Sequence, residues 1–196
     1  EIYNVGIIYY TMTSRAKEAV DMGRAALKLF GVELPERDFR RARDRELEQV
    51  AINLGTRTWD DLLHFPITTD PAYRMLISLM VSLQPAAQIL NPKIHEVLSV
   101  TMVNVTLSAG ATTKETPTVY AQYGKLLAGL GEYQTAYDFG QLGMQLSERL
   151  DDGHEKSRTF HLVADNINHW WRPLATSVAL ARQALRYAQE ALLRPS

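Results

Sequence analysis

The stretch Tyr123–Ala136, YGKLLAGLGEYQTA, decides the fold of this 196-residue chain. Helical spacing runs to Ala128, is interrupted by Gly129-Leu130-Gly131, and resumes at Glu132. Two glycines around one residue can either cradle a phosphate or allow a sharp turn between helices. A dinucleotide loop also needs a third glycine and a preceding strand, but Gln134 occupies that third position and a helix precedes the loop. The stretch therefore predicts a helix hairpin and not a nucleotide site.

Large and small side chains alternate around this turn in a fixed pattern. Small residues lie where two helices must approach closely, at Gly124, Ala136 and Gly140. Gly131 is expected to shape the turn, and Tyr133 is expected to wedge beneath it. This pattern is typical of a tetratricopeptide-like helix hairpin.

The same frame fits two other parts of the chain. In the first hairpin Ser14 replaces the turn glycine, and the matching residues are Tyr3, Ile7, Ala16, Ala19, Gly23 and Ala26. In the last hairpin they are His161, Asp165, Leu174, Ser177 and Ala181. Ala19 and Ala136 are equivalent residues that lie 117 positions apart (136 − 19), or three units of 39. The next equivalent residue, Ser177, follows after 41 (177 − 136), so the period is near 40. Because residues 37–54 and 75–103 match poorly, the sequence predicts a degenerate array.

Helical spacing covers almost the whole chain, and no stretch reads convincingly as a strand. The first expected helix ends near residue 12. The others span 15–30, 36–54, 70–90, 91–109, 116–128, 132–150, 155–171 and 173–193. Thr58 can cap a short turn through residue 63, and Pro85 is expected to kink or break its helix. We predict one all-α domain over 1–196, with about nine helices stacked as antiparallel hairpins in a right-handed tetratricopeptide-like superhelical array.

Composition excludes several classes of function. The net charge is −1 and there is no cysteine, so disulfides, thiol catalysis and cysteine metal sites are absent and no nucleic-acid partner is indicated. The long uncharged runs 75–92 and 97–113 contain polar residues, so we expect buried helices and no membrane insertion. The chain begins and ends in helical sequence, which suggests a piece of a longer, cytoplasmic protein.

His161, Asp165 and His169 are the first candidate site. Their spacing of four and eight residues places them on one face if a single helix spans 155–171. Two imidazoles and a carboxylate can bind a metal, but such residues can equally form a polar stripe. Asp165 falls at a close-packed position of the frame, where its charge needs a partner from His161, His169 or Arg182.

The second candidate is a groove. In the repeat frame Asn166, His169 and Trp170 fall on the face that lines the groove of such arrays. A protein partner or a small ligand would bind there.

Other polar patterns have simpler interpretations. His95-Glu96 resembles half of a zinc-protease motif, but Ser99 stands where the second histidine is needed, so helix capping or surface polarity is expected. The charged run Glu36–Glu48 is expected to be a solvated face with pairs four residues apart. The tyrosines are expected in the core and at the hairpin; they are Tyr120, Tyr123, Tyr133 and Tyr137.

Three stretches together resemble a known family: 14–36, SRAKEAVDMGRAALKLFGVELPE; 123–150, YGKLLAGLGEYQTAYDFGQLGMQLSERL; and 166–191, NINHWWRPLATSVALARQALRYAQEA. They are similar to the helical region of very large bacterial and fungal signalling proteins. Those proteins carry a serine/threonine-kinase-like domain, an AAA/STAND-type ATPase, this array, GAF domains and often a histidine kinase. The Asn168-His169-Trp170 motif is the most distinctive part of the resemblance.

The resemblance implies a non-catalytic interaction module of such a kinase or ATPase. It carries no catalytic residue, metal ligand or cofactor onto this segment, because the family's Walker lysine, phosphoacceptor histidine and kinase loop have no counterpart here. We expect the segment to bind a protein partner or flanking domains of the same chain and to relay that binding. The alternatives are a ligand- or metal-binding sensory domain at the His161/Asp165/His169 face, and the inducer-binding array of a maltose-regulator-like transcription activator.

Overall fold

The computed structural model describes residues 2–193, which form ten α-helices and one 3-10 turn and contain no β-strand. The helices are α1 (Ile2–Met12), α2 (Ala16–Lys28), α3 (Phe39–Leu54), α4 (Trp59–Leu63), α5 (Pro71–Leu90), α6 (Pro92–Ala109), α7 (Thr116–Gly129), α8 (Tyr133–Leu150), α9 (Gly153–Asn166) and α10 (Leu174–Leu193), with the 3-10 turn η1 (Asn168–Trp170). The all-α class is thereby confirmed. The right-handed superhelical stacking stays a prediction.

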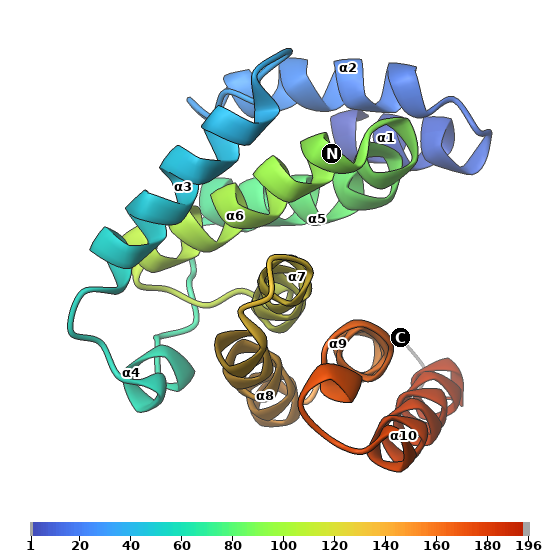
Figure 1. Cartoon of the computed structure of the whole chain (residues 1–196). Coiled ribbons are helices and arrows are strands. Elements are labelled where there is room, and N and C mark those ends of the chain that lie inside the picture. The colour runs from blue at the N-terminus through green and yellow to red at the C-terminus, as the bar shows by residue number, and fades with distance from the viewer. Residues whose placement is uncertain (1, 194–196) are drawn as a thin grey trace. The chain divides into compact units, whose positions relative to one another are not determined.

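The chain forms two compact units. Figure 1 shows the first in blue to green and the second in olive to red, except that α4, drawn in teal, belongs to the second. Unit 1 holds the residues up to Thr56 together with Pro66–Thr113, and so contains α1, α2, α3, α5 and α6. Unit 2 holds Arg57–Phe65 and the residues from Lys114 onward, and so contains α4 and α7 to α10. The single domain predicted over 1–196 stays a prediction.

The centre of unit 1 is the pair α5 and α6, the two helices that carry the uncharged runs. Each begins as the sequence predicts: the Asp70 side chain accepts from the Ala72 N–H at 2.8 Å, and the Asn91 side chain accepts from the Lys93 N–H at 3.0 Å. Caps of this kind satisfy N–H groups that the first turn of a helix leaves unpaired. The predicted break at Pro85 is wrong, because α5 runs unbroken through it with the ring exposed.

Helices α1 and α2 pack on one side of α5, and α3 packs on α6 (Figure 1). The turn between α1 and α2 passes through Ser14 at φ 60°, so the residue predicted to replace the turn glycine does adopt a left-handed conformation. Helix α3 forms its main contacts with α6 and not with α2, its neighbour in sequence. The predicted hairpin between successive helices is therefore wrong for α2 and α3, which the long connection 29–38 separates.

Asn104 joins α3 to α6. The residue is 6% exposed, and its side chain donates to the Glu46 carbonyl at 2.8 Å and to the Glu46 carboxylate at 2.6 Å. Its oxygen accepts from Asn53 at 2.9 Å. Asn104 begins an Asn-Val-Thr sequon that lies within α6, and its side chain is taken up by the contact between α6 and α3.

Unit 2 is built from two hairpins, α7–α8 and α9–α10, with α9 packed on both α7 and α8. The second hairpin is antiparallel, since Gly153 at the start of α9 lies beside Ala191 near the end of α10. The short helix α4 is held by a capping box between Thr58 and Asp61, as its predicted cap requires. It contacts α8, where Trp59 and Phe139 meet edge to face with ring centroids 5.0 Å apart.

No helix among residues 2–193 combines the length and the apolar composition that crossing a bilayer requires. The runs 75–92 and 97–113 are mostly buried within unit 1, as predicted.

Candidate functional site

The turn between α7 and α8 has the geometry that the opening stretch predicts. Gly131 adopts φ 88°, and a Cβ placed on Gly124 would lie only 2.8 Å from the carbonyl oxygen of Ala136. Only glycine allows the two backbones to approach this closely. The same Cβ would also lie 2.8 Å from Cδ1 of Ile167, and one on Gly140 would lie 3.3 Å from that atom. Ile167 is 1% exposed and fills the space that these two glycines leave.

Ile167 is the first residue of a turn that follows α9. The Trp170 N–H donates to the Ile167 carbonyl at 3.2 Å, and the Arg172 N–H donates to the Asn168 carbonyl at 2.8 Å. Asn168 is 2% exposed, and its side-chain amide donates to the hydroxyls of Thr176 and Ser177 at 2.7 and 2.9 Å. Its carboxamide therefore fixes the turn to the first residues of α10.

This anchored turn places two tryptophans beside two tyrosines of α8. Trp170 stacks on Tyr133 with ring centroids 5.2 Å apart and planes 11° from parallel. The ring centroid of Trp171 lies 6.5 Å from that of Tyr137, the residue one helical turn after Tyr133. We refer to Tyr133, Tyr137, Trp170 and Trp171 as the aromatic cluster.

The aromatic cluster is open to solvent. Trp170 is 52% exposed, Trp171 45% and Tyr133 38%. Two polar side chains lie at its edge. Arg172 lies over the Tyr137 ring with Cζ 5.1 Å from the centroid, and the ring centroids of His169 and Trp170 are 4.9 Å apart. Broad, rigid aromatic rings with an arginine beside them are typical of protein-binding surfaces. The predicted wedge position of Tyr133 is wrong, because the residue lies on the surface and its ring stacks on Trp170.

The structure separates the residues of the first candidate site. Helix α9 ends at Asn166, so His169 lies in η1 and does not share a helix face with His161 and Asp165. His161 Nε2 and Asp165 Oδ2 are 3.5 Å apart, and both side chains are more than half exposed. The burial predicted for Asp165 is wrong, and its partner is His161 and not Arg182.

The early end of α9 has a local cause. The Asn166 side chain donates back to the Leu162 carbonyl at 3.1 Å, and Asn168 bonds forward to α10. Asparagine side chains compete with helical hydrogen bonds in this way. Among residues 2–193, no group of three histidine, aspartate or glutamate side chains is arranged to hold a metal ion.

Of the predicted groove residues, the structure brings Trp170 and His169 together in the exposed surface, while Asn166 is half-buried at the end of α9. The repeat frame predicts neither Trp171 nor Arg172 as a site residue, and Tyr137 is expected in the core. One signal could have found all three: the Trp170-Trp171-Arg172 run follows a hairpin whose second helix carries tyrosines four residues apart. Helical spacing puts those tyrosines on one face, where such a run can meet them.

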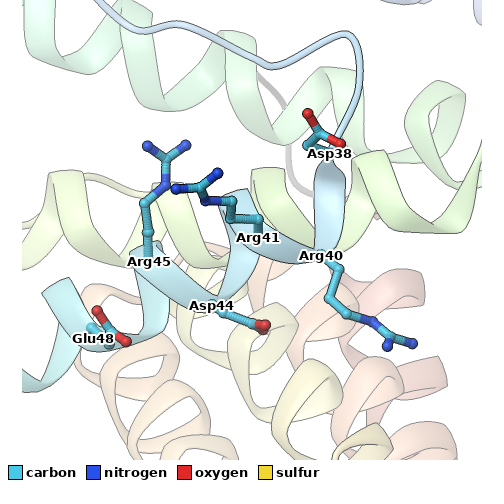
Figure 2. Close-up of a pocket in the computed structure, with 6 residues that line it drawn as sticks. All are labelled: Asp38, Arg40, Arg41, Asp44, Arg45 and Glu48. Carbon is cyan, nitrogen blue, oxygen red and sulfur yellow. The ribbon is translucent and has the colours of Figure 1, made fainter.

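The charged run on α3 is solvated, as predicted. Figure 2 shows Arg41 and Arg45 pointing to one side of the helix and Arg40 to another, around an open hollow of about 510 Å³ with only charged residues in its lining. The pairs that form differ from the prediction. Within the described run 36–48, Arg43 pairs with the adjacent Asp44 at 2.8 Å, and no pair spans four residues.

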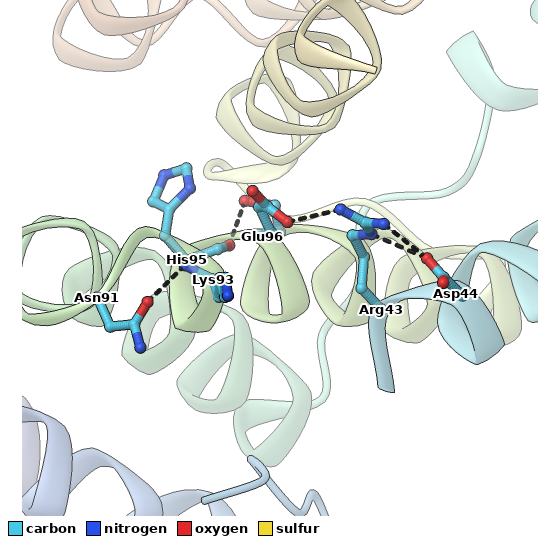
Figure 3. A network of polar contacts seen from close by, with 7 residues as sticks. Arg43, Asp44, Asn91, Lys93, His95 and Glu96 are labelled. Atoms are coloured by element: carbon cyan, nitrogen blue, oxygen red, sulfur yellow. Dashed lines mark hydrogen bonds and ion pairs between the residues drawn. The ribbon is translucent and has the colours of Figure 1, made fainter. Parts of the chain in front are cut away.

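Arg43 also reaches across to α6, where it meets Glu96 at 2.8 Å (Figure 3). The Glu96 carboxylate is thus occupied by an ion pair inside unit 1. The surface position expected for His95 is wrong, because this residue is 6% exposed. Neither residue of the half-motif is placed for zinc chemistry.

No protein-family model, curated protein or solved structure matches this chain. The aromatic cluster therefore carries the functional argument by its own geometry.

Proposed function

We propose that this chain is a non-catalytic protein-interaction module that binds a segment of a partner protein, or of a flanking domain, at the aromatic cluster. One observation carries the proposal. Four aromatic rings are held in fixed positions on the surface of unit 2, with Trp170 and Trp171 about half exposed. Exposed large rings that are already ordered lose little conformational freedom on binding, and tryptophan, tyrosine and arginine dominate binding hot spots.

The surroundings of the aromatic cluster support binding more than catalysis. The polar groups at its edge are Arg172 and His169, and each contacts a ring. The Arg172 Nε also donates to the Tyr137 hydroxyl at 3.2 Å. A partner segment with apolar side chains and backbone carbonyls would satisfy both the rings and the arginine.

The resemblance to the helical region of multidomain signalling proteins supports a relay role for this binding. In such a protein the module would pass partner binding on to kinase or ATPase domains. Closely packed hairpins suit that role, since α7, α8 and the turn that bears Trp170 meet at glycines and would move as one body.

The test begins with a peptide library displayed on phage and selected against the whole chain. The selected peptide is then titrated calorimetrically into the wild-type chain and Trp170→Ala. Ile52→Ala is the matched control, because Ile52 is 70% exposed on α3 in unit 1. Loss of a hot-spot tryptophan costs about 2 kcal/mol or more, so Trp170→Ala is expected to weaken binding about 30-fold.

Ile52→Ala is expected to bind like the wild-type chain, and all three proteins should give the same far-UV circular dichroism. The proposal fails if the selected peptides bind Trp170→Ala as tightly as the wild type. It also fails if selection recovers no peptide that binds the wild-type chain.

A further inference from the structure

A second surface of unit 2 has a different character from the aromatic cluster. It is the outer side of α10, where apolar residues alternate at spacings of four and three along the helix. We refer to this set as the α10 stripe; its members are Leu174, Val178, Ala181, Leu185, Ala188 and Leu192. This spacing is the heptad pattern of a seam that packs against one other helix.

The packing inside unit 2 leaves the four large side chains of the α10 stripe exposed, while Ala181 and Ala188 are half-buried. Helix α10 contacts α9 and η1 through its other side, where Ser177 and Ala184 are buried and Tyr187 meets Phe160 edge to face. In the stripe, by contrast, the exposed fractions are large: Leu174 70%, Val178 47%, Leu185 59% and Leu192 87%. An apolar stripe of this length is a binding surface more often than a free one.

Charge on α10 limits the identity of the occupant. Arg182 and Arg186 lie four residues apart beside the stripe, both are exposed, and neither forms an ion pair within residues 2–193. The described part of α10 holds a single carboxylate, Glu190. Because Glu190 follows Arg186 by four residues, it lies on the same flank, which carries two positive charges and one negative charge among the described residues of α10.

We infer that the α10 stripe docks one amphipathic helix of a partner protein, with acidic residues along the flank that faces Arg182 and Arg186. The stripe runs for 19 residues from Leu174 to Leu192, whose ends lie about 27 Å apart along the helix, and a partner helix of similar length would cover it. The two alanines leave shallow positions that larger partner side chains can fill. This inference does not rest on the function proposed for the aromatic cluster.

Two other occupants fit the observations less well. A second copy of α10 would bring one basic flank near another and would offer only Glu190 in compensation. An anionic membrane attracts clusters of several basic residues, whereas this flank has two. An acidic helix meets both the apolar spacing and the charge.

The experiment uses the whole chain and two designed helical peptides of 21 residues. Both have the same leucine stripe at heptad spacing; one carries glutamates on its flanks and the other carries lysines at those positions. Fluorescence anisotropy of the labelled peptides is expected to show binding of the glutamate peptide at least tenfold tighter than that of the lysine peptide. The double variant R182E/R186E should reverse the preference.

Leu185→Glu should weaken binding of the glutamate peptide at least tenfold, while Ile52→Glu on α3 should leave it unchanged. Light scattering and vesicles of phosphatidylserine and phosphatidylcholine test the other occupants. Equal binding of the two peptides, or none, would overturn the inference. So would a wild-type dimer, or binding to the vesicles, that Leu185→Glu abolishes.

Discussion

A close backbone approach between α7 and α8 gives the sharpest stability prediction. Gly124 lies in the interior of α7, where alanine ordinarily stabilises a helix by about 1 kcal/mol relative to glycine. Here the added methyl would lie 2.8 Å from the Ala136 carbonyl oxygen and 2.8 Å from Ile167 Cδ1. Since the oxygen belongs to the backbone of α8, the hairpin itself must open by several tenths of an ångström.

Overpacking of this kind costs about 1 to 3 kcal/mol. Because the clash is with a backbone oxygen, we place this change in the upper part of that range, about 2 to 3 kcal/mol. After the gain of about 1 kcal/mol in helix propensity, we expect Gly124→Ala to lower the free energy of unfolding of unit 2 by about 1 to 2 kcal/mol. Gly129 provides the matched control. It ends the same helix, and a Cβ there would meet no atom within 4 Å, so Gly129→Ala should change stability by about +0.5 kcal/mol or less.

Urea unfolding followed by tryptophan fluorescence measures the difference. All three tryptophans of the chain, Trp59, Trp170 and Trp171, belong to unit 2, so their emission reports on that unit. With a denaturant slope near 2 kcal/mol per molar, the midpoint for Gly124→Ala should fall by roughly 0.5 to 1 M. The reasoning is refuted if Gly124→Ala is as stable as the wild type, or gains stability like Gly129→Ala.

Three further predictions concern single groups. Burial raises the pKa of Tyr123 to about 12, while the pKa of this side chain in the unfolded chain is near 10. The stability that the buried, neutral Tyr123 contributes is therefore complete below pH 10 and is lost as the pH rises toward 12. In urea titrations at pH 11, the wild-type chain should lose roughly 1 kcal/mol of its free energy of unfolding, and Tyr123→Phe should not show this loss. Identical pH profiles for the two proteins would contradict this. Asn104→Ala leaves the Glu46 carboxylate without its donor and should destabilise unit 1 by about 1 to 3 kcal/mol, which thermal melts by far-UV circular dichroism can measure; an unchanged melting temperature would show that the pairing has no net value. Thr58→Ala removes half of a capping box and should cost unit 2 about 1 kcal/mol in the tryptophan assay, while Asp61→Asn, which keeps an acceptor, should cost less; equal losses would argue against the cap.

Much of the fold follows from local sequence signals. The Asp70-Pro71 and Asn91-Pro92 starts, the Thr58 cap and the Gly131 turn each fix a backbone geometry within four residues, and the structure has all of them. The close approach at Gly124 was also predictable, because only a missing side chain allows it.

Features that depend on contacts between different helices were not predictable in this way. Helix α5 continues through Pro85, since residues on both sides of the proline are buried in unit 1. Helix α9 ends at Asn166 because Asn168 reaches hydroxyls on α10 that lie eight and nine residues further on. Apolar spacing in 155–171 suggested one helix, and that error moved His169 onto the wrong face.

The candidate site was found only in part for the same reason. The repeat frame identified Trp170 and His169, but it gave no information on the rings they would meet. Tyr137 was expected in the core because tyrosines at helical spacing are usually buried there. Tyr137 is half-buried beside Trp171, and the place of its ring depends on where the turn after α9 lies, which the packing of Ile167 against Gly124 and Gly140 determines.

The most direct test of the aromatic cluster uses the indole N–H groups as separate reporters. A nitrogen-15 spectrum of the chain should show three indole signals, which the variants W59F, W170F and W171F would assign. On addition of the selected peptide, the Trp170 and Trp171 signals should shift with a common dissociation constant while that of Trp59, packed against Phe139, stays in place. A shift of Trp59 alone, or binding that moves none of the three, would contradict the assignment of the aromatic cluster as the partner-binding surface.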